Sequence, residues 1–403
     1  FKSNFTAFDD HVFPLFSDKK SKVVYFMIDA LRYELGVELK NFLENENLQL
    51  KINSLFSPLP SITNVGMASL LPDAQNEIKL SLESNHLNVF YADKNINDAS
   101  NRMNVFKNKF GDQFKQINLD QISSNLKKQI EKNIKLLVVR SYSMDKLLET
   151  NDDSALNTIF NTFKKIKYTL NILSEIGFTN AFIVSDHGFL FNLYRDDRGN
   201  VIQKPDGNWV ELHDRCLVGS GMEDDNNLAF LSEDLSLTGF DSKLIFPKSI
   251  YPYKKNKFYL HGGLSIQETL VPLLTIELSN PKNTHKKDFE VKLSYRDGKT
   301  DKITTRNPIL NVEVSSLDLV SQAEEEEIEL IIDAFDNNNN IVGRIKPNID
   351  VPDYKMLRVL YGEKRKITLK LDDNYEGDVI IKAINPNNEI VLDELKLKTE
   401  YLL

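Results

Sequence analysis

The sequence contains a single cysteine, Cys216, among its 403 residues. One cysteine excludes an internal disulfide bond and is typical of a protein that works in a reducing cytosol. The chain also lacks an apolar run of the roughly 20 residues that a membrane helix needs, and no signal peptide opens it. We therefore expect a cytoplasmic protein that does not enter a membrane.

Positive charge is not in excess, because 50 Lys and Arg residues stand against 59 Asp and Glu residues, for a net charge of −9. A protein that coats nucleic acid is normally basic, so this balance argues against that class. It does not exclude a nucleotide or phosphodiester substrate held through a metal. The length exceeds what one core usually fills, which predicts two domains.

The first two thirds of the chain alternate buried strands with helices. Continuous apolar runs at 23–28, 136–139 and 181–185 predict parallel strands, and each is followed by a polar turn or a helical pattern. This alternation is typical of an α/β domain with a mostly parallel sheet and flanking helices. We interpret residues 73–133 as an excursion off the sheet, and residues 192–227 as a long functional loop or a small antiparallel insert.

After residues 279–283 the pattern changes to short alternating segments separated by turn signals, which predicts an all-β sandwich of immunoglobulin-like type. The expected domains are an N-terminal lead-in at 1–21, an α/β domain at 22–279 and a sandwich at 284–403. The predicted strands of the sandwich are 289–295, 309–314, 327–335, 341–345, 366–371, 379–383 and 390–397.

Polar side chains follow the strands of the α/β domain or begin a helix: Asp29, Thr63, Asp145, Asp186, His187 and His261. Because an open parallel sheet builds its site at the carboxyl ends of its strands, we expect these groups at one edge of the sheet. Simple helix capping is the alternative role for Asp29 and for Thr63.

This set of groups suits the chemistry of phosphoric esters. Carboxylates and imidazoles are ligands for one or two Zn²⁺ ions, with Mn²⁺ as the alternative. Thr63 would be the nucleophile, its oxygen bound to metal and thereby deprotonated. Arg32 and Arg215 are candidates to contact a substrate phosphate, and a structural salt bridge is the alternative for each. We interpret His213 as a surface or loop histidine.

Four segments, in order along the chain, resemble the PglZ domain family of the alkaline phosphatase superfamily: residues 24–34, 59–72, 185–189 and 261–268. The resemblance spans roughly residues 22–277 and implies an alkaline-phosphatase-like fold and a metal-dependent phosphatase or phosphodiesterase. Carried over by position, it implies one metal site of Asp29, Thr63, Asp186 and His187. It implies a second site that contains Asp145 and His261.

One stretch departs from the family pattern. The family has a Tyr-His-Asn-like stretch before its Ile-Asp pair, and an Asp or His four residues later. This chain has Ser-Tyr-Ser-Met-Asp at 141–145, with Glu149 in the later position. Glutamate can bind Zn²⁺, so the resemblance implies a second site of Asp145, Glu149 and His261 that is weaker or altered.

These observations predict a metal-dependent phosphoric ester hydrolase with a preference for phosphodiesters. A third, Mg²⁺-type site or an extra arginine clamp, which monoesterases of the superfamily commonly add, is not evident in the sequence. The resemblance also implies a bacterial phage-defence system of the BREX type, or a signalling system, with protein partners. The rival prediction is a scaffold or interaction protein that keeps the fold and a metal but has little turnover.

Overall fold

The computed structural model describes residues 2–17, 21–44, 48–83, 86–149, 155–192, 200–235, 242–255, 257–278, 289–316, 327–347, 356–386 and 389–401. The chain forms two compact units, Phe1–Gln121 with Ile130–Asn280, and Ile122–Gln129 with Pro281–Leu403. The predicted junction at 279–284 lies outside the described residues. Among the helices of the described ranges, none is long and apolar enough to cross a membrane.

A six-stranded sheet forms the centre of the first unit. Its order is β2 (Gln49–Phe56), β15 (Leu270–Glu277), β8 (Asn180–Ser185), β1 (Val23–Ile28), β7 (Leu136–Ser141) and β6 (Phe114–Asn118). The last four strands are parallel, and β15 runs antiparallel to both of its neighbours. The predicted α/β fold with a mostly parallel sheet is confirmed.

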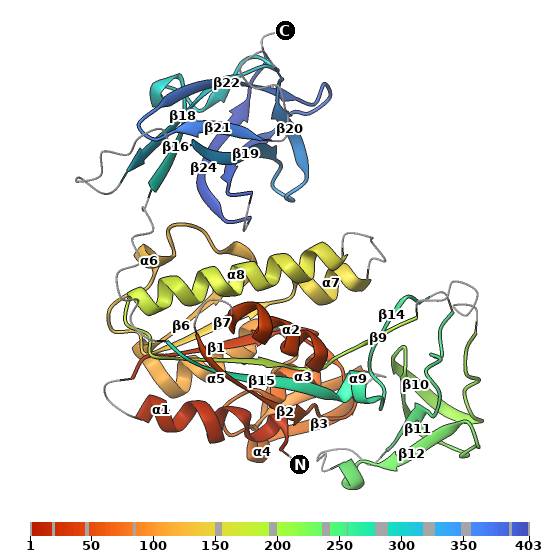
Figure 1. The fold of residues 1–403 in the computed structure, drawn as a ribbon. Helices are drawn as coiled ribbons and strands as arrows, with labels where there is room; N and C mark the ends of the chain where they lie inside the picture. The colour runs from red at the N-terminus through yellow and green to blue at the C-terminus, as the bar shows by residue number, and fades with distance from the viewer. Residues whose placement is uncertain are drawn as a thin grey trace. The chain divides into compact units, whose positions relative to one another are not determined.

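Helices cover both faces of this sheet (Figure 1). One face carries α2 (Tyr33–Glu44) and α8 (Ala155–Glu175), and the other carries α1 (Phe13–Ser17) and α5 (Ala99–Phe110). Every residue of β1 is buried, because a strand covered on both faces has no side exposed to water. The continuous apolar run at 23–28 follows from this arrangement.

The two edge strands of the sheet, β2 and β6, were not predicted from the sequence. Residues 73–133 were expected to leave the sheet, but β6 within that range pairs with β7, so the expectation is wrong for this strand. Both β6 and β2 have one partner strand each, and most of their residues are at least partly exposed. An edge strand needs few apolar residues, so its sequence shows little of the strand pattern. The rest of the range contains an antiparallel sheet of β3 (Ile78–Glu83), β4 (His86–Tyr91) and β5 (Lys94–Asn95).

An antiparallel insert lies in the sequence between the segment that carries His187 and the segment that carries His261. It contains β10 (Gly207–His213), β11 (Cys216–Gly221), β12 (Asn227–Leu231) and β13 (Lys243–Pro247), in the order β10-β11-β13-β12. Of the two alternatives for residues 192–227, the described part forms the insert. The other α-helices and strands in the described part of the unit are α3 (Thr63–Ser69), α4 (Ala74–Glu77), α7 (Ser143–Glu149), β9 (Leu190–Phe191), β14 (Tyr259–Leu260) and α9 (Ile266–Thr269).

The described residues of the second unit are all-β apart from the short helix α6 (Leu126–Gln129) and one turn of 3-10 helix. Its strands surround one hydrophobic core, and buried residues alternate with more exposed ones along β22 and β23. The all-β character is confirmed, and the immunoglobulin-like detail stays a prediction. The strands are β16 (Phe289–Tyr295), β17 (Lys302–Ile303), β18 (Ile309–Ser316), β19 (Glu327–Phe335), β20 (Ile341–Ile345), β21 (Leu357–Leu360), β22 (Lys364–Leu371), β23 (Asp378–Ile384) and β24 (Val391–Thr399).

Candidate metal centre

The carboxyl ends of β1, β7 and β8 lie at the same level of the sheet. Ile28 is in register with Ser141 on one side and with Ser185 on the other. Asp29 and Asp186, the next residues of β1 and β8, are therefore neighbours. The backbone N–H of Ala30 donates to Asp186 Oδ1 over 3.1 Å, which holds the two strand ends together.

Thr63 is the first residue of α3, and its hydroxyl does not cap the helix. The N-cap residue is Ile62, whose side chain makes no capping bond. The Thr63 hydroxyl instead lies 3.2 Å from Nε2 of His187. The same nitrogen is 3.7 Å from Asp29 Oδ1 and 3.4 Å from Asp186 Oδ2. Two ligands on one tetrahedral ion, each about 2.1 Å from it, are about 3.4 Å apart, so His187 is spaced from each of the other three groups as a ligand of the same ion would be.

Hydrogen bonds fix the orientation of this group. His187 Nδ1 lies 3.0 Å from the carbonyl oxygen of Gly188, and a carbonyl only accepts, so Nδ1 carries the proton and Nε2 presents its lone pair. The buried Asn4 donates to the carbonyl of Ser185 over 2.9 Å, and Ser57 donates to the carbonyl of Asp186 over 2.5 Å. The backbone that carries Asp186 and His187 is thus anchored from two other segments.

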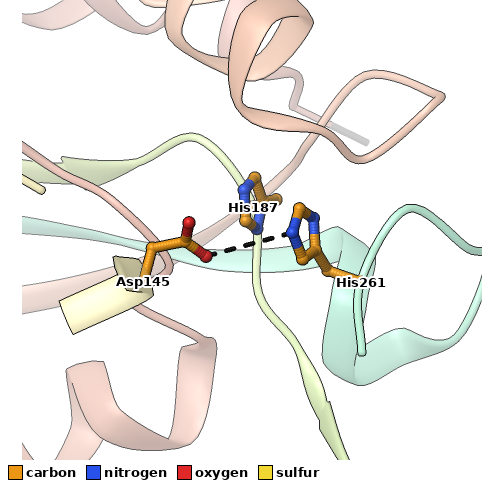
Figure 2. A group of neighbouring side chains, drawn as sticks. All are labelled: Asp145, His187 and His261. Carbon is orange, nitrogen blue, oxygen red and sulfur yellow. Dashed lines mark ion pairs between the residues drawn. The ribbon is translucent and has the colours of Figure 1, made fainter. Parts of the chain in front are cut away.

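A second group of ligands adjoins the first. Asp145 and Glu149 are four residues apart on α7, so both carboxylates lie on one side of that helix. Asp145 accepts a hydrogen bond from the Tyr259 hydroxyl and lies 3.9 Å from His261 Nε2. Figure 2 shows its carboxylate directed toward the imidazole of His261, with His187 beside it. Ligand atoms of Asp145, His187 and His261 all lie within 4.8 Å of one another.

The electrostatics of the two groups fit a divalent cation. Burial raises the pKa of Asp29 well above its usual range, and the facing Asp186 and Asp145 raise it further. Burial likewise raises the pKa of Asp186 and lowers that of His261 well below its usual value. Within these two groups, three of the buried side-chain atoms that the structure describes have no hydrogen-bond partner: Asp29 Oδ1, Asp186 Oδ2 and His261 Nε2. Buried polar atoms without partners are costly, and a cation among them would remove that cost.

The two arginines predicted to contact substrate phosphate lie in different surroundings. Arg215 is buried and bonds to Glu268 over 2.9 Å and to the carbonyls of Ser249 and Tyr251, so the structural salt bridge is the role that its contacts support. Arg32 pairs with Glu34 over 2.7 Å and is partly exposed.

His213 does not behave as a surface histidine. Its ring lies 3.7 Å, centroid to centroid, from that of His261, and its ligand atom groups with those of Glu149 and His261. The expectation of a surface or loop histidine is therefore wrong. β10 carries this residue from the insert to the cluster, a placement that no motif in the sequence indicated.

Sequence reasoning also missed residues that position the cluster: Asn4, Ser57, Arg102 and Tyr259. The guanidinium of Arg102 is buried, bonds to the carbonyls of Ile96 and Asn97, and opposes the rise of the Asp29 pKa. These residues come from segments without motif character. Only Tyr259, two residues before His261, stood next to a predicted ligand.

Comparison with known proteins places the first unit in a family. A model of the BREX system PglZ alkaline phosphatase-like domain matches residues 7–276 of the chain. The alkaline phosphatase-like protein BrxZ of Escherichia coli O9:H4 (strain HS) is 25% identical over 416 residues, which cover 98% of this chain and 45% of that protein. The alkaline phosphatase-like protein PglZ of Bacillus cereus (strain H3081.97) is 24% identical over 315 residues, covering 73% and 35%.

The chain spans less than half the length of these curated relatives. Among solved structures, phosphonoacetate hydrolase from Sinorhizobium meliloti 1021 in complex with phosphonoformate aligns with a TM-score of 0.40 and 10% identity. That alignment covers 66% of this chain and 91% of the hydrolase.

Proposed function

This chain belongs to the PglZ family of alkaline phosphatase-like domains, and on that premise we propose that it is a metal-dependent hydrolase of phosphoric esters. The observation that carries the proposal is the Thr63 hydroxyl, 3.2 Å from His187 Nε2, because that nitrogen lies within 3.7 Å of two buried carboxylates that have unpartnered oxygens. A hydroxyl in that position is available as a nucleophile instead of capping α3.

Two groups of residues would hold two divalent ions, with Zn²⁺ preferred and Mn²⁺ as the alternative. Asp29, Thr63, Asp186 and His187 form the first, and Asp145, Glu149 and His261 form the second. A bound ion would lower the pKa of the hydroxyl it holds and stabilise charge on the phosphoryl group. Thr63 would give up its hydroxyl proton, and its oxygen would bond to phosphorus as the ester P–O bond breaks and the leaving group departs as an alcohol with a proton. In a second step, water would attack phosphorus, the bond from phosphorus to the Thr63 oxygen would break, and that oxygen would regain a proton.

The surroundings of Thr63 favour a phosphodiester over a phosphomonoester. Its chain neighbours Ile62 and Asn64 line a pocket of about 570 Å³, together with Asn88, Asn97 and Leu212 among others. A volume of roughly 300–1,000 Å³ is typical of small-molecule sites. A diester carries a second organic substituent besides its leaving group, and this pocket has room to hold it, whereas a monoester has only the leaving group to place. Among nucleotides, the cyclic nucleotides and dinucleotides are phosphodiesters of this class, and so are short nucleic acid segments.

Hydrolysis of bis-p-nitrophenyl phosphate and p-nitrophenyl phosphate with Zn²⁺ or Mn²⁺ tests the proposal. We expect metal-dependent turnover that is faster on the diester and falls at least about 1,000-fold in Thr63→Ala. Thr63→Ser keeps a hydroxyl and should retain part of the activity. Thr162→Ala is a matched control, because it removes a buried hydroxyl that bonds to the Thr158 carbonyl in α8. If Thr63→Ala leaves the turnover unchanged, Thr63 is not the nucleophile.

A scaffold with a metal but little turnover is the second candidate, and Glu149 is the observation that favours it. Glu149 is exposed, whereas Asp145 is half-buried and His261 is buried, so Glu149 is the least fixed ligand of the second group. Both candidates bind metal, and only the hydrolase needs Thr63 for turnover. Comparison of the turnover of the metal-loaded wild type with that of metal-loaded Thr63→Ala therefore separates them.

Family membership also supports a role in a BREX-type system, or a signalling system, with protein partners. We propose a cytoplasmic protein, consistent with a single cysteine that is buried and unpaired. A net charge of −9 gives no general attraction to nucleic acid. Capture of a nucleic acid substrate would then depend on the metal centre and the pocket beside Thr63.

A further inference from the structure

His213 reaches the metal centre from an element that supplies none of the other ligands. It is the last residue of β10, whereas Glu149 ends α7 and His261 directly follows β14. One ligand atom each of Glu149, His213 and His261 lies within 4.8 Å of the other two. Two ligands of one Zn²⁺ ion lie at most about 4.2 Å apart, so a small inward movement would bring the three groups onto one ion.

The hydrogen bond of His213 leaves the correct nitrogen for binding. Its Nδ1 lies 3.1 Å from the carbonyl oxygen of His261, and because a carbonyl only accepts, Nδ1 carries the proton. Nε2 therefore presents a lone pair. His261 has the same arrangement, since its Nδ1 lies 3.2 Å from the Ser61 carbonyl. A metal-bound imidazole usually donates its other N–H to a carbonyl or carboxylate in this way.

Packing holds the two imidazoles against each other. Their ring centroids are 3.7 Å apart with an interplanar angle of 39°, and the His187 ring stacks on the same His261 ring at 4.3 Å. Gly262 makes the close approach possible, because a Cβ at that position would lie 3.0 Å from the His213 Cβ. Gly262 also has φ +100°, a conformation that a residue with a side chain rarely adopts.

A buried atom without a partner indicates where an ion would lie. His261 is 2% exposed, and its Nε2 has no hydrogen-bond partner. Asp145 Oδ1 is the nearest carboxylate oxygen at 3.9 Å, and the Tyr259 hydroxyl already donates to that oxygen. The imidazole nitrogen of His213, whose ring packs against that of His261, would give the ion a donor that is better fixed than the exposed Glu149.

We propose that His213 is a ligand of the second metal ion, bound through Nε2 beside Asp145, Glu149 and His261. This inference rests on the proposed function only for the presence of that ion. The set offers two nitrogen and two oxygen donors, which suits Zn²⁺, and Zn²⁺ accepts a fifth ligand when substrate is bound. The insert would then be part of the metal centre as well as a neighbour of it.

Zinc content per chain, measured after dialysis against a weak chelator, tests the proposal. We expect two ions in the wild type and one in His213→Ala, with the affinity for the second ion reduced at least about 100-fold, since loss of a group that merely orients a ligand already costs 10–100-fold. His86→Ala is the matched control, because His86 is exposed on β4 and belongs to none of the three potential metal-binding groups.

A cysteine variant keeps the test decisive if His213→Ala fails to fold. With Co²⁺ in place of Zn²⁺, His213→Cys should show thiolate-to-cobalt charge-transfer absorption that the wild type lacks, since Cys216 is buried away from water and its pKa is raised. Two ions retained by His213→Ala, or no such absorption in a folded His213→Cys, would overturn the role of His213 alone. A wild type that holds no ion would overturn the proposed function as well.

Discussion

At the scale of single residues, the centre collects charge that a folded protein normally avoids burying. Asp29 and Asp186 are buried at adjacent strand ends, and each has an oxygen without a partner. Burial and the mutual repulsion of these carboxylates raise the pKa of Asp29, and burial raises that of Asp186. Such a site is unfavourable without a cation and favourable with one, so protons and metal compete for it.

We predict that zinc stabilises the protein more at about pH 8 than at about pH 5.5. A raised carboxyl pKa means that the metal-free fold binds protons more tightly than the unfolded chain. Ionisation of Asp29 and Asp186 therefore lowers its stability as the pH rises above the unfolded value of about 4. Zinc replaces those protons, so its effect grows with pH, and thermal unfolding with and without Zn²⁺ at both pH values measures it.

Asp29→Asn serves as the control for this pH effect. It removes one of the facing charges, so it should stabilise the metal-free protein at about pH 8 and abolish most of the zinc effect. A zinc effect that is equal at both pH values, or larger at the lower one, would contradict the assignment of these carboxylates as ligands.

The sequence was informative for residues that end buried strands. Asp29, Asp186 and His187 follow runs that both faces of the sheet bury, and topology brings such ends to one edge. No comparable sequence pattern indicates the role of the buried Arg215 or of His213 in the insert. Arg215 pairs with Glu268 across 53 positions of sequence, and His213 meets His261 across 48, so only tertiary packing decides their roles.

At the scale of elements, α3 and the end of β8 must touch for Thr63 to reach His187. Gly66 lies on the contacting side of α3, where an added Cβ would come within 2.6 Å of the Asp186 carbonyl oxygen and 2.8 Å of its Cβ. Backbone cannot yield as a flexible side chain can. The 3.2 Å distance between the Thr63 hydroxyl and His187 Nε2 therefore depends on glycine, which has no Cβ, at position 66.

We predict that Gly66→Ala destabilises the protein by roughly 1–3 kcal/mol and greatly reduces both zinc affinity and hydrolysis, because α3 must move away from Asp186. Urea unfolding, zinc titration and diester hydrolysis measure the three effects. Ala68→Gly is the control: it costs α3 about 1 kcal/mol of helix propensity without adding an atom toward β8. Zinc affinity and turnover in Gly66→Ala equal to those of the wild type would show that the contact is not needed.

Element prediction succeeded where burial is two-sided and failed at the edges of the sheet. Continuous apolar runs predicted the central strands β1, β7 and β8. The edge strands β2 and β6 contain both polar and apolar residues, because each has one partner strand and is partly exposed, so their sequences do not show this pattern. The i, i+4 spacing of Asp145 and Glu149 became meaningful only once α7 was seen to carry both. A resemblance supplied their pairing, since periodicity alone over so short a helix is weak.

At the scale of the whole molecule, the two compact units have separate hydrophobic cores. All of the proposed metal ligands belong to the first unit. The second unit includes residues 122–129, and within it Ser124 bonds to the carbonyls of Val391 and Leu392. Unfolding of the second unit would release these eight residues as a loop of the first, and closing a loop of that length adds little entropic cost.

We therefore predict two thermal transitions for the full chain, of which zinc raises one. Binding stabilises only the unit that holds the ligands, by RT ln(1 + [L]/Kd), so an excess of 100 times Kd should add about 2.7 kcal/mol to that unit. Leu369→Ala removes a fully buried side chain from the core of the second unit. It should lower the free energy of unfolding of that unit by about 2–5 kcal/mol, and with it the temperature of the other transition, without changing the zinc effect. Calorimetry with and without Zn²⁺ measures both shifts, and a single transition that zinc and Leu369→Ala both displace would show that the units unfold as one.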